Sequence, residues 1–166
     1  MIQTIKTPMG ELLLGSYAGK ICLCDWRFRQ QRTSIDSRLQ KSLNANYQLG
    51  SCELIKQASL QLDEYFHTQR SIFSLPLLLQ GTDFQISVWQ ALGKIPYAAT
   101  ISYLQLAKNI NKPLAVRAVA NANASNALSI LIPCHRVINS NGELGGYAGG
   151  ATAKEKLLKL ESSSQH

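Results

Sequence analysis

Alternating apolar and polar residues near the start of the chain are typical of β-strands. GELLLG (10–15) and KICLCDWRF (20–28) flank a turn that contains Gly19, so we expect a β-hairpin. In KICLCDWRF the alternation places four residues on one face of the strand: Cys22, Cys24, Trp26 and Phe28. Free cysteine packs as a small hydrophobic residue, which favours a core role for both cysteines.

The rest of the first half predicts helices and one further strand. CELIKQASLQLDEYF (52–66) has helical periodicity, and its apolar face comprises Leu54, Ala58, Leu62 and Tyr65. The polar residues 30–50 predict no more than a short helix over 34–43. SIFSLPLLL (71–79) predicts a strand near a sheet edge, because Pro76 inside it has no N–H to donate.

A capping box at Thr82 marks a boundary in the chain. Thr82 is followed three residues later by Gln85, the pattern that begins a helix. We expect this helix to extend to about Leu92, with Phe84, Val88 and Leu92 on its buried face. The boundary divides the chain into an N-terminal domain, residues 1–80, and a C-terminal domain, residues 81–166.

A second helix start follows at Ser102. Ser102 and Gln105 repeat the capping-box pattern and predict a short helix over 103–110, with Leu104 and Ala107 facing inward. NINKP (109–113) then breaks the helix, since Asn111 tolerates a left-handed conformation. Two short helices joined in this way form either a helix-turn-helix or an ordinary helical hairpin.

The helix after this turn, PLAVRAVANANA (113–124), is composed mainly of small residues. Pro113 suits its first turn, and Arg117 is its only large polar side chain. A helix of this kind can approach a nucleic acid closely, for example in the minor groove, which is about 6 Å wide. Close packing against a neighbouring helix is the alternative interpretation.

Composition and charge narrow the class of protein. The 166 residues are 45% hydrophobic and 16% charged, and no apolar run is long enough to cross a bilayer. The N-terminus lacks the pattern of a secretory signal, so we expect a cytoplasmic protein with free thiols and no membrane association. Residues 1–99 contain 10 basic and 7 acidic residues, whereas residues 100–166 contain 7 and 3. The basic second part favours a polyanionic partner.

Candidate chemistry is concentrated in ILIPCHRVIN (130–139). His135 directly follows Cys134, and a thiol with a pKa of about 8.5 needs a base to react at neutral pH. On a turn the imidazole reaches the thiol directly or through a water, whereas on a strand it points away. Glu161, in the last predicted helix, is a candidate to orient His135. Taken alone, the Cys134–His135 pair also fits a cysteine with a purely structural role. The three histidines are not spaced along the chain as metal ligands are, so we expect no metal site.

Several sequence blocks between Gly81 and Glu161 occur together in one known family. They are GTDFQISVWQAL, IPYAATISY, RAVANANASN, IPCHRVI, and GGYAGG followed by KEKLLKLE. In this order and spacing they resemble the O6-alkylguanine-DNA alkyltransferases, also called methylated-DNA–protein-cysteine methyltransferases. TPMGELLLGSYAGKI and LDEYF resemble the smaller first domain of that family.

The resemblance implies a mixed α/β fold. A small N-terminal domain with an antiparallel sheet and helix, of the ribonuclease H-like type, precedes a mainly helical, winged helix-turn-helix-like C-terminal domain. The implied function is DNA repair by direct reversal, in which the alkyl group of O6-alkylguanine, and also of O4-methylthymine, moves irreversibly to Cys134. The damaged nucleotide is first flipped through the minor groove. Double-stranded DNA with this lesion is the implied partner, and we expect a monomer with no cofactor, no metal and no obligate protein partner.

Residue roles follow from the same resemblance. Cys134 matches the alkyl acceptor, His135 its water-mediated base, and Glu161 the group that orients this histidine. Tyr103 matches the tyrosine that donates toward guanine N3 as charge develops on the leaving base. The matched residues of the alkyl pocket are Tyr147, Ala148, Pro133, Asn123 and Ser129.

The DNA-facing residues are matched in the same way. Arg117 corresponds to the arginine that fills the gap left by the flipped nucleotide, and Asn126 to the hinge between the reader helix and the cysteine segment. The further matched residues are Ala115, Ala118, Ala120 and Ser102.

Three positions depart from the pattern of many relatives. Ala120 replaces a glycine, Ala127 replaces a proline after the hinge, and Ala148 replaces a serine, so that a backbone N–H has to serve near guanine O6. None of these changes removes a required group. A lesion-binding protein without transfer is the alternative, but such relatives lack the acceptor cysteine that is present here as Cys134.

Overall fold

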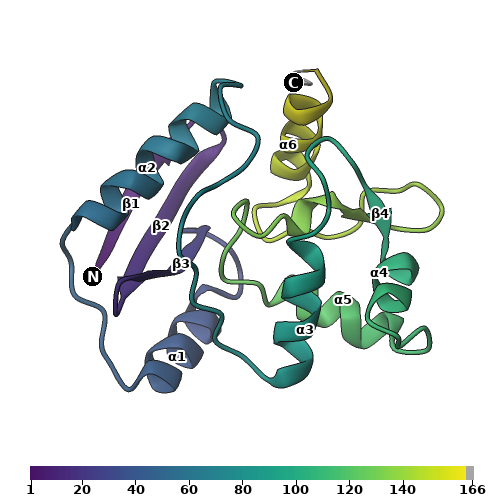
Figure 1. The fold of residues 1–166 in the computed structure, drawn as a ribbon, viewed down its shortest axis with the longest axis horizontal. Coiled ribbons are helices and arrows are strands. Elements are labelled where there is room, and N and C mark those ends of the chain that lie inside the picture. Colours follow the sequence, from purple (N-terminus) through teal and green to yellow (C-terminus); the bar gives the residue numbers. More distant parts are fainter. Residues whose placement is uncertain (164–166) are drawn as a thin grey trace.

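The computed structural model describes residues 1–163, which form two lobes side by side (Figure 1). The first lobe begins with an antiparallel sheet of β1 (Ile2–Thr7), β2 (Gly10–Tyr17) and β3 (Lys20–Trp26), in the order β1-β2-β3. The predicted hairpin is confirmed as β2 and β3. Its turn places Ala18 and Gly19 at φ angles of 50° and 76°, and glycine adopts such angles without strain.

Two helices complete the first lobe, α1 (Arg32–Leu43) and α2 (Glu53–Phe66). In Figure 1, α2 lies along the sheet. Its buried face comprises Ile55, Ala58, Leu62, Tyr65 and Phe66, whereas Leu54 is only half-buried. The prediction for Leu54 was therefore wrong by one position, because the spacing from Ile55 to Ala58, Leu62 and Tyr65 follows the helical repeat equally well.

Two predictions near the sheet were also wrong. Phe28 does not extend the buried face of the strand, since β3 ends at Trp26 and Phe28 is 78% exposed. Residues 71–79 form no strand but make a single parallel bridge, between Leu77 and Ile21 of β3. Pro76 offers only its carbonyl, which accepts from the Ile21 N–H, so the pairing does not continue past it.

The second lobe is mainly helical. In chain order its elements are α3 (Asp83–Leu92), β4 (Ile101–Ser102), α4 (Tyr103–Asn109), α5 (Val116–Ala124), the 3₁₀ turn η1 (Cys134–Arg136), β5 (Val137–Ile138) and α6 (Ala151–Ser163). Strands β4 and β5 pair in parallel. The capping box at Thr82 and Gln85 is confirmed, with both reciprocal hydrogen bonds present. Phe84, however, is only half-buried, and Trp89 joins Val88 and Leu92 inside.

The helix-turn-helix pair α4 and α5 differs from the prediction in detail. Ser102 caps α4 by accepting from the Gln105 N–H, but the Gln105 side chain bonds Asn109 instead of closing a capping box. Leu104 is 37% exposed, and Leu106 is buried in its place. Pro113 lies in the turn before α5, not in its first helical turn, because the helix begins at Val116.

One hydrophobic core joins the two lobes. It contains Cys24 and Trp26 of β3 together with Cys134 and residues of α3 to α6. The edge of β3 meets the segment before η1, where the Cys24 N–H donates to the Ala127 carbonyl at 2.9 Å. None of the helices in residues 1–163 combines the length and hydrophobicity that a membrane span requires.

Candidate active site and DNA interface

The acceptor candidate Cys134 lies on a buried single-turn helix. It begins η1, directly after Pro133, and its N–H donates to the Ile132 carbonyl at 2.8 Å. The residue is 2% exposed. In a 3₁₀ turn successive side chains point about 120° apart, so Cys134 and His135 do not point to opposite sides as they would on a strand.

His135 is held by Glu161 of α6. The imidazole Nε2 and the Glu161 Oε2 are 2.7 Å apart, and both side chains have no exposure to solvent. Nε2 therefore carries the proton and donates to the carboxylate, which leaves Nδ1 as the acceptor nitrogen. Among the described residues, Nδ1 is buried without a hydrogen-bond partner. Burial lowers the pKa of His135, and the hydrogen bond and charge of Glu161 act in the opposite direction.

Glu161 receives five hydrogen bonds. Arg136 donates twice, from Nε to Oε1 at 2.8 Å and from Nη2 to Oε2 at 3.0 Å. Besides His135, the hydroxyl of Tyr65 and the N–H of Ala98 also donate to it, at 2.6 and 3.3 Å. Burial acts to raise the pKa of Glu161, but the hydrogen bonds of His135 and Arg136 outweigh it and lower the pKa well below its usual range. Glu161 is thus a permanent carboxylate at neutral pH.

Several groups act on the Cys134 thiol. Burial raises its pKa, and a hydrogen bond with Asn126 opposes this effect. The charges of Arg29 and Lys154 also act to lower the pKa, whereas that of Asp25 acts to raise it. The net direction is upward, so at rest the thiol is protonated.

Lys154 of α6 is fully buried beneath the loop that precedes this helix. Its Nζ donates to the carbonyls of Val137 at 2.6 Å and Gly146 at 3.2 Å, and also to that of Leu144. Burial lowers the pKa of Lys154 to about 8. The ammonium therefore ties the loop that carries Tyr147 and Ala148 to β5.

Asn126 links α5 to the cysteine segment. Its Nδ2 donates to the Ile132 carbonyl at 3.0 Å, and its Oδ1 accepts from the Leu128 N–H at 3.0 Å. Both hydrogen bonds close the turn between α5 and Cys134. Asn126 therefore lies in the connection between α5 and Cys134, and its role as a hinge stays a prediction.

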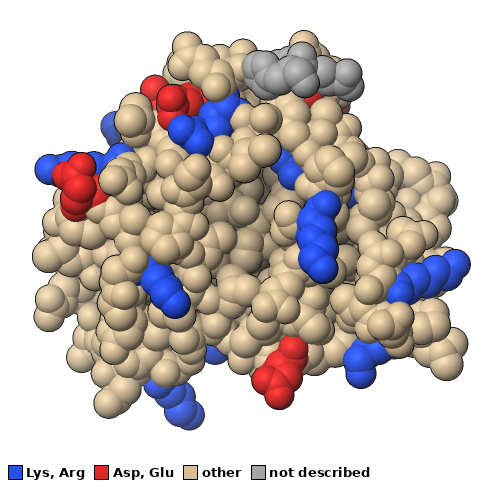
Figure 2. Space-filling model, in the orientation of Figure 1, with Lys and Arg blue, Asp and Glu red and all other residues tan. Residues whose placement is uncertain are grey.

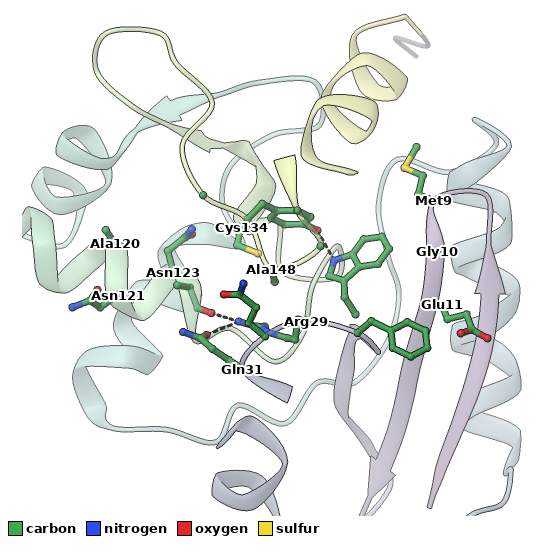
Figure 3. Close-up of a pocket in the computed structure, with 18 of the residues that line it drawn as sticks. Met9, Gly10, Glu11, Arg29, Gln31, Ala120, Asn121, Asn123, Cys134 and Ala148 are labelled. Carbon is green, nitrogen blue, oxygen red and sulfur yellow. Dashed lines mark hydrogen bonds between the residues drawn. The ribbon is translucent and has the colours of Figure 1, made fainter. Parts of the chain in front are cut away.

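A cavity of about 740 Å³ leads to Cys134 and is lined by both lobes. Figure 3 shows Asn123 of α5 on one side of Cys134 and Glu11 of β2 on the other, with Arg29 between the lobes. Of the predicted pocket residues, Asn123, Tyr147 and Ala148 line this cavity, together with Tyr103. The other two predicted pocket residues, Pro133 and Ser129, do not line the cavity. Ser129 is buried, and its hydroxyl donates to Asp25 Oδ1 at 3.0 Å.

Most of the residues predicted to face DNA lie on α5 or at its start. Arg117 is exposed and, among the described residues, its guanidinium has no partner. Ala118 is exposed, and Ala115 and Ala120 are half-buried. Arg117, Ala120 and Tyr103 border a second hollow of about 580 Å³ beside the loop around Gly145. Arg117 and the cavity of Cys134 are therefore joined through Ala120 and Tyr103, which line both hollows.

Basic side chains outnumber acidic ones on the face drawn in Figure 2. They are spread over both lobes and do not form one dense patch. A net charge of +7 distributed in this way provides general attraction to a polyanion, whereas recognition of particular groups must come from the site itself.

Comparison with known proteins decides the family. The model of the 6-O-methylguanine DNA methyltransferase ribonuclease-like domain matches residues 1–79, and that of the DNA-binding domain matches residues 83–163. The methylated-DNA–protein-cysteine methyltransferase of Methanosarcina barkeri is 40% identical over 160 residues, which cover 96% of each chain. The chain belongs to this family.

Other members of the methyltransferase family agree over nearly the full length. The constitutive enzyme of Bacillus subtilis is 42% identical over 97% of this chain and 94% of its own. The crystal structure of Mycobacterium tuberculosis OGT in complex with DNA superposes with a TM-score of 0.84 at 37% identity, covering 98% of this chain and 93% of that one. The predicted fold, an antiparallel ribonuclease-like lobe followed by a helical DNA-binding lobe, is confirmed.

The structure accommodates the three departures from the methyltransferase pattern. Ala127 stands where proline is common in relatives. Its backbone is fixed by β3, because its carbonyl accepts from the Cys24 N–H. Ala120 adds one methyl group to a half-buried site on α5. Ala148 lines the cavity of Cys134.

Five side chains of the site were missed by sequence reasoning. Tyr65, Trp26 and Arg29 come from the first lobe, Arg136 from η1 and Lys154 from α6. Trp26 donates from Nε1 to the Tyr147 hydroxyl at 3.0 Å and so supports the pocket wall. The signals available were a lysine on the inner face of the last helix and the charged run DWRFRQQR after a buried strand, neither of which is specific.

Proposed function

We propose that this protein repairs DNA by transferring the methyl or other alkyl group of O6-alkylguanine to its own Cys134. Membership of the methyltransferase family supports the reaction class. The observation that carries the assignment is the buried acceptor nitrogen Nδ1 of His135, whose ring is fixed by Glu161. His135 directly follows Cys134, whose thiol lines the cavity. A base without a protein partner at this position is suited to accept the thiol proton through a water.

In the proposed reaction the thiol proton moves through the water to His135 Nδ1. The resulting thiolate attacks the alkyl carbon in line, so that an S–C bond forms as the O6–C bond breaks. Electrons of the broken bond remain on the guanine, and the Tyr103 hydroxyl donates toward N3 as this negative charge develops. Glu161 stabilises the imidazolium throughout. Guanine returns to its normal form by taking up a proton, and the protein retains a thioether.

In the same proposal, α5 enters the DNA and flips the damaged nucleotide out of the duplex. Guanine O6 is stacked and paired in duplex DNA, so a thiol that is 2% exposed cannot reach the alkyl carbon unless the nucleotide is flipped. Arg117 takes the place of the flipped nucleotide, and the small residues of α5 allow entry into the minor groove. In the same proposal Ser102 fixes the start of α4 against the phosphate backbone, and Asn126 carries the connection to Cys134.

The transfer is proposed to be irreversible and to occur once per molecule. Release of the alkyl group from the thioether would require the Cys134 thiolate to leave, and a thiolate is a poor leaving group, so the alkyl group stays on the protein and the protein is consumed. Cys24 lies close enough that the charge of Cys134 raises the pKa of Cys24, but a thiol does not cleave a thioether. We further propose division into domains at 1–80 and 81–166, activity as a monomer, location in the cytoplasm and additional action on O4-methylthymine.

Intact-mass analysis tests the proposal. The protein is incubated with duplex oligonucleotide that contains O6-methylguanine, and its mass is expected to rise by one methylene equivalent. Cys134→Ala is expected to bind the same duplex without any gain. Binding without a gain in the unaltered protein would identify a lesion-binding protein instead, and methanol release with repeated turnover would refute irreversible transfer.

A further inference from the structure

Among the described residues of the first lobe, the side chain of Tyr65 donates directly to Glu161. Tyr65 is near the end of α2, and its hydroxyl donates to Glu161 Oε2 at 2.6 Å across a sequence separation of 96 residues. We propose that Tyr65 is a positioning residue for alkyl transfer, which sets how strongly Glu161 supports His135. This inference rests on the proposed function, because it concerns the base of that reaction.

The arrangement at Glu161 Oε2 is the basis of the proposal. Three donors share this one oxygen: the Tyr65 hydroxyl, His135 Nε2 and Arg136 Nη2. Each donor draws part of the negative charge of the oxygen toward itself. The share that remains for His135 determines how well the carboxylate stabilises an imidazolium. Tyr65 therefore reduces the support that Glu161 gives to a protonated His135, and it does so without contacting the thiol or the substrate.

The Tyr65 hydroxyl keeps its proton and therefore remains a hydrogen-bond donor. The residue is fully buried, and burial together with the charge of Glu161 raises the pKa of its hydroxyl, so that the proton stays on the phenol. Its ring is fixed by edge contacts with Phe66 and Tyr97, at centroid distances of 5.3 and 6.3 Å, and by a tilted contact with Phe73 at 5.5 Å. A ring held on three sides keeps the hydroxyl directed at Oε2.

The other groups that face His135 come from the second lobe. Glu161 and Lys154 project from α6, Arg136 belongs to η1, and the Tyr147 ring packs edge-on against the imidazole with ring centroids 6.3 Å apart. Arg136 and Lys154 act to lower the pKa of His135, and Glu161 acts to raise it. Tyr65 is the member of this set that the first lobe supplies, and its removal changes no formal charge.

Tyr65→Phe isolates the effect because it deletes only the hydroxyl. Glu161 keeps its other four donors, and more of its charge is then available to His135. The pKa of His135 rises, so the acidic limb of the pH–rate profile moves to higher pH. We expect a shift of about one pH unit, which lowers the single-turnover rate constant about tenfold on that limb, where the rate follows the neutral imidazole fraction. The DNA concentration for half-saturation is expected to stay unchanged.

Tyr47→Phe is the matched control. The Tyr47 hydroxyl also donates to a carboxylate of the first lobe, Asp36 Oδ1 at 2.7 Å, but contacts none of the catalytic groups. Its profile is expected to overlay that of the unaltered protein. Equal shifts in the two variants, or a Tyr65→Phe limb that coincides with that of the unaltered protein, would overturn the positioning role.

A second substitution tests the direction in which the acidic limb of the pH–rate profile moves. Site-specific 3-fluorotyrosine at Tyr65 makes the hydroxyl a stronger donor, so the acidic limb is expected to move to lower pH, opposite to Tyr65→Phe. This measurement decides the question even where Tyr65→Phe folds poorly, and a shift to higher pH or no shift would refute the proposal. Failure of the unaltered protein to take up the methyl group would instead refute the proposed function.

Discussion

Glu161→Gln keeps the shape of the side chain and removes its charge. In the folded protein this carboxylate receives five hydrogen bonds, and its loss leaves the 6% exposed Arg136 without a counter-ion. Removing one partner of a buried ion pair costs about 3–5 kcal/mol. For a domain of this size each kcal/mol lowers the melting temperature by about 2–4 °C. We therefore expect a decrease of about 6–20 °C, measured by calorimetry at pH 7, together with loss of methyl transfer.

Glu155→Gln is the control on the same helix. Glu155 and Lys159 pair at 3.0 Å, but their side chains are 54% and 74% exposed. An exposed pair of this kind contributes less than about 1 kcal/mol, because water and salt screen it. A decrease for Glu161→Gln no larger than that for Glu155→Gln would refute the argument that the buried network stabilises the fold.

The pH dependence of the same pair of proteins provides a second check. The pKa of Glu161 is lower in the folded protein than in the unfolded chain, so the unfolded chain takes up the proton first as the pH falls. The contribution of Glu161 is complete above about pH 4.3 and is lost as the pH falls toward the folded pKa. The difference in unfolding free energy between the unaltered protein and Glu161→Gln should shrink between about pH 5 and pH 3. A constant difference over this range would contradict the assignment.

Three further predictions concern other parts of the site. Arg117→Ala should slow transfer from duplex DNA far more than reaction with free O6-alkylguanine base, in single-turnover assays; equal losses would exclude a role in base flipping. Asp25→Asn leaves the buried Arg29 without its carboxylate and should cost about 3–5 kcal/mol in urea unfolding; a cost below about 1 kcal/mol would contradict this. Lys154→Met should remove the gain in stability that the unaltered protein shows between about pH 8 and pH 10.4, because the pKa of Lys154 is lowered by folding; an unchanged pH profile would refute it.

Local patterns were sufficient to predict much of the fold. The hairpin, α2, α3 and the α4–α5 pair depend on turn residues, caps and periodicity within a few residues of one another. Errors occurred where two spacings fit equally well, as for Leu54 against Ile55 and Leu104 against Leu106. The helical repeat does not distinguish these neighbours, and only packing against the rest of the protein does.

The pairing of Glu161 with His135 was expected only through the resemblance, and the rest of the network was not expected at all. Tyr65 and Glu161 are separated by 96 residues, and Trp26 and Tyr147 by 121. No local pattern marks such pairs, because the approach of the two lobes creates them. A tyrosine at the end of an amphipathic helix is normally explained by core packing, and Tyr65 also satisfies that explanation.

In the proposed reaction, the two lobes share the stabilisation of the two charges that form. Proton transfer from Cys134 to His135 would separate charge in a buried site, where burial alone opposes both charged forms. Glu161 of the second lobe supports the imidazolium directly. On the thiolate side, Arg29 of the first lobe and Lys154 of α6 both act to lower the thiol pKa. The second lobe supplies one compensating group for each charge, Glu161 and Lys154, and the first lobe adds Arg29 on the thiolate side. The first lobe is therefore part of the chemical site as well as of the fold.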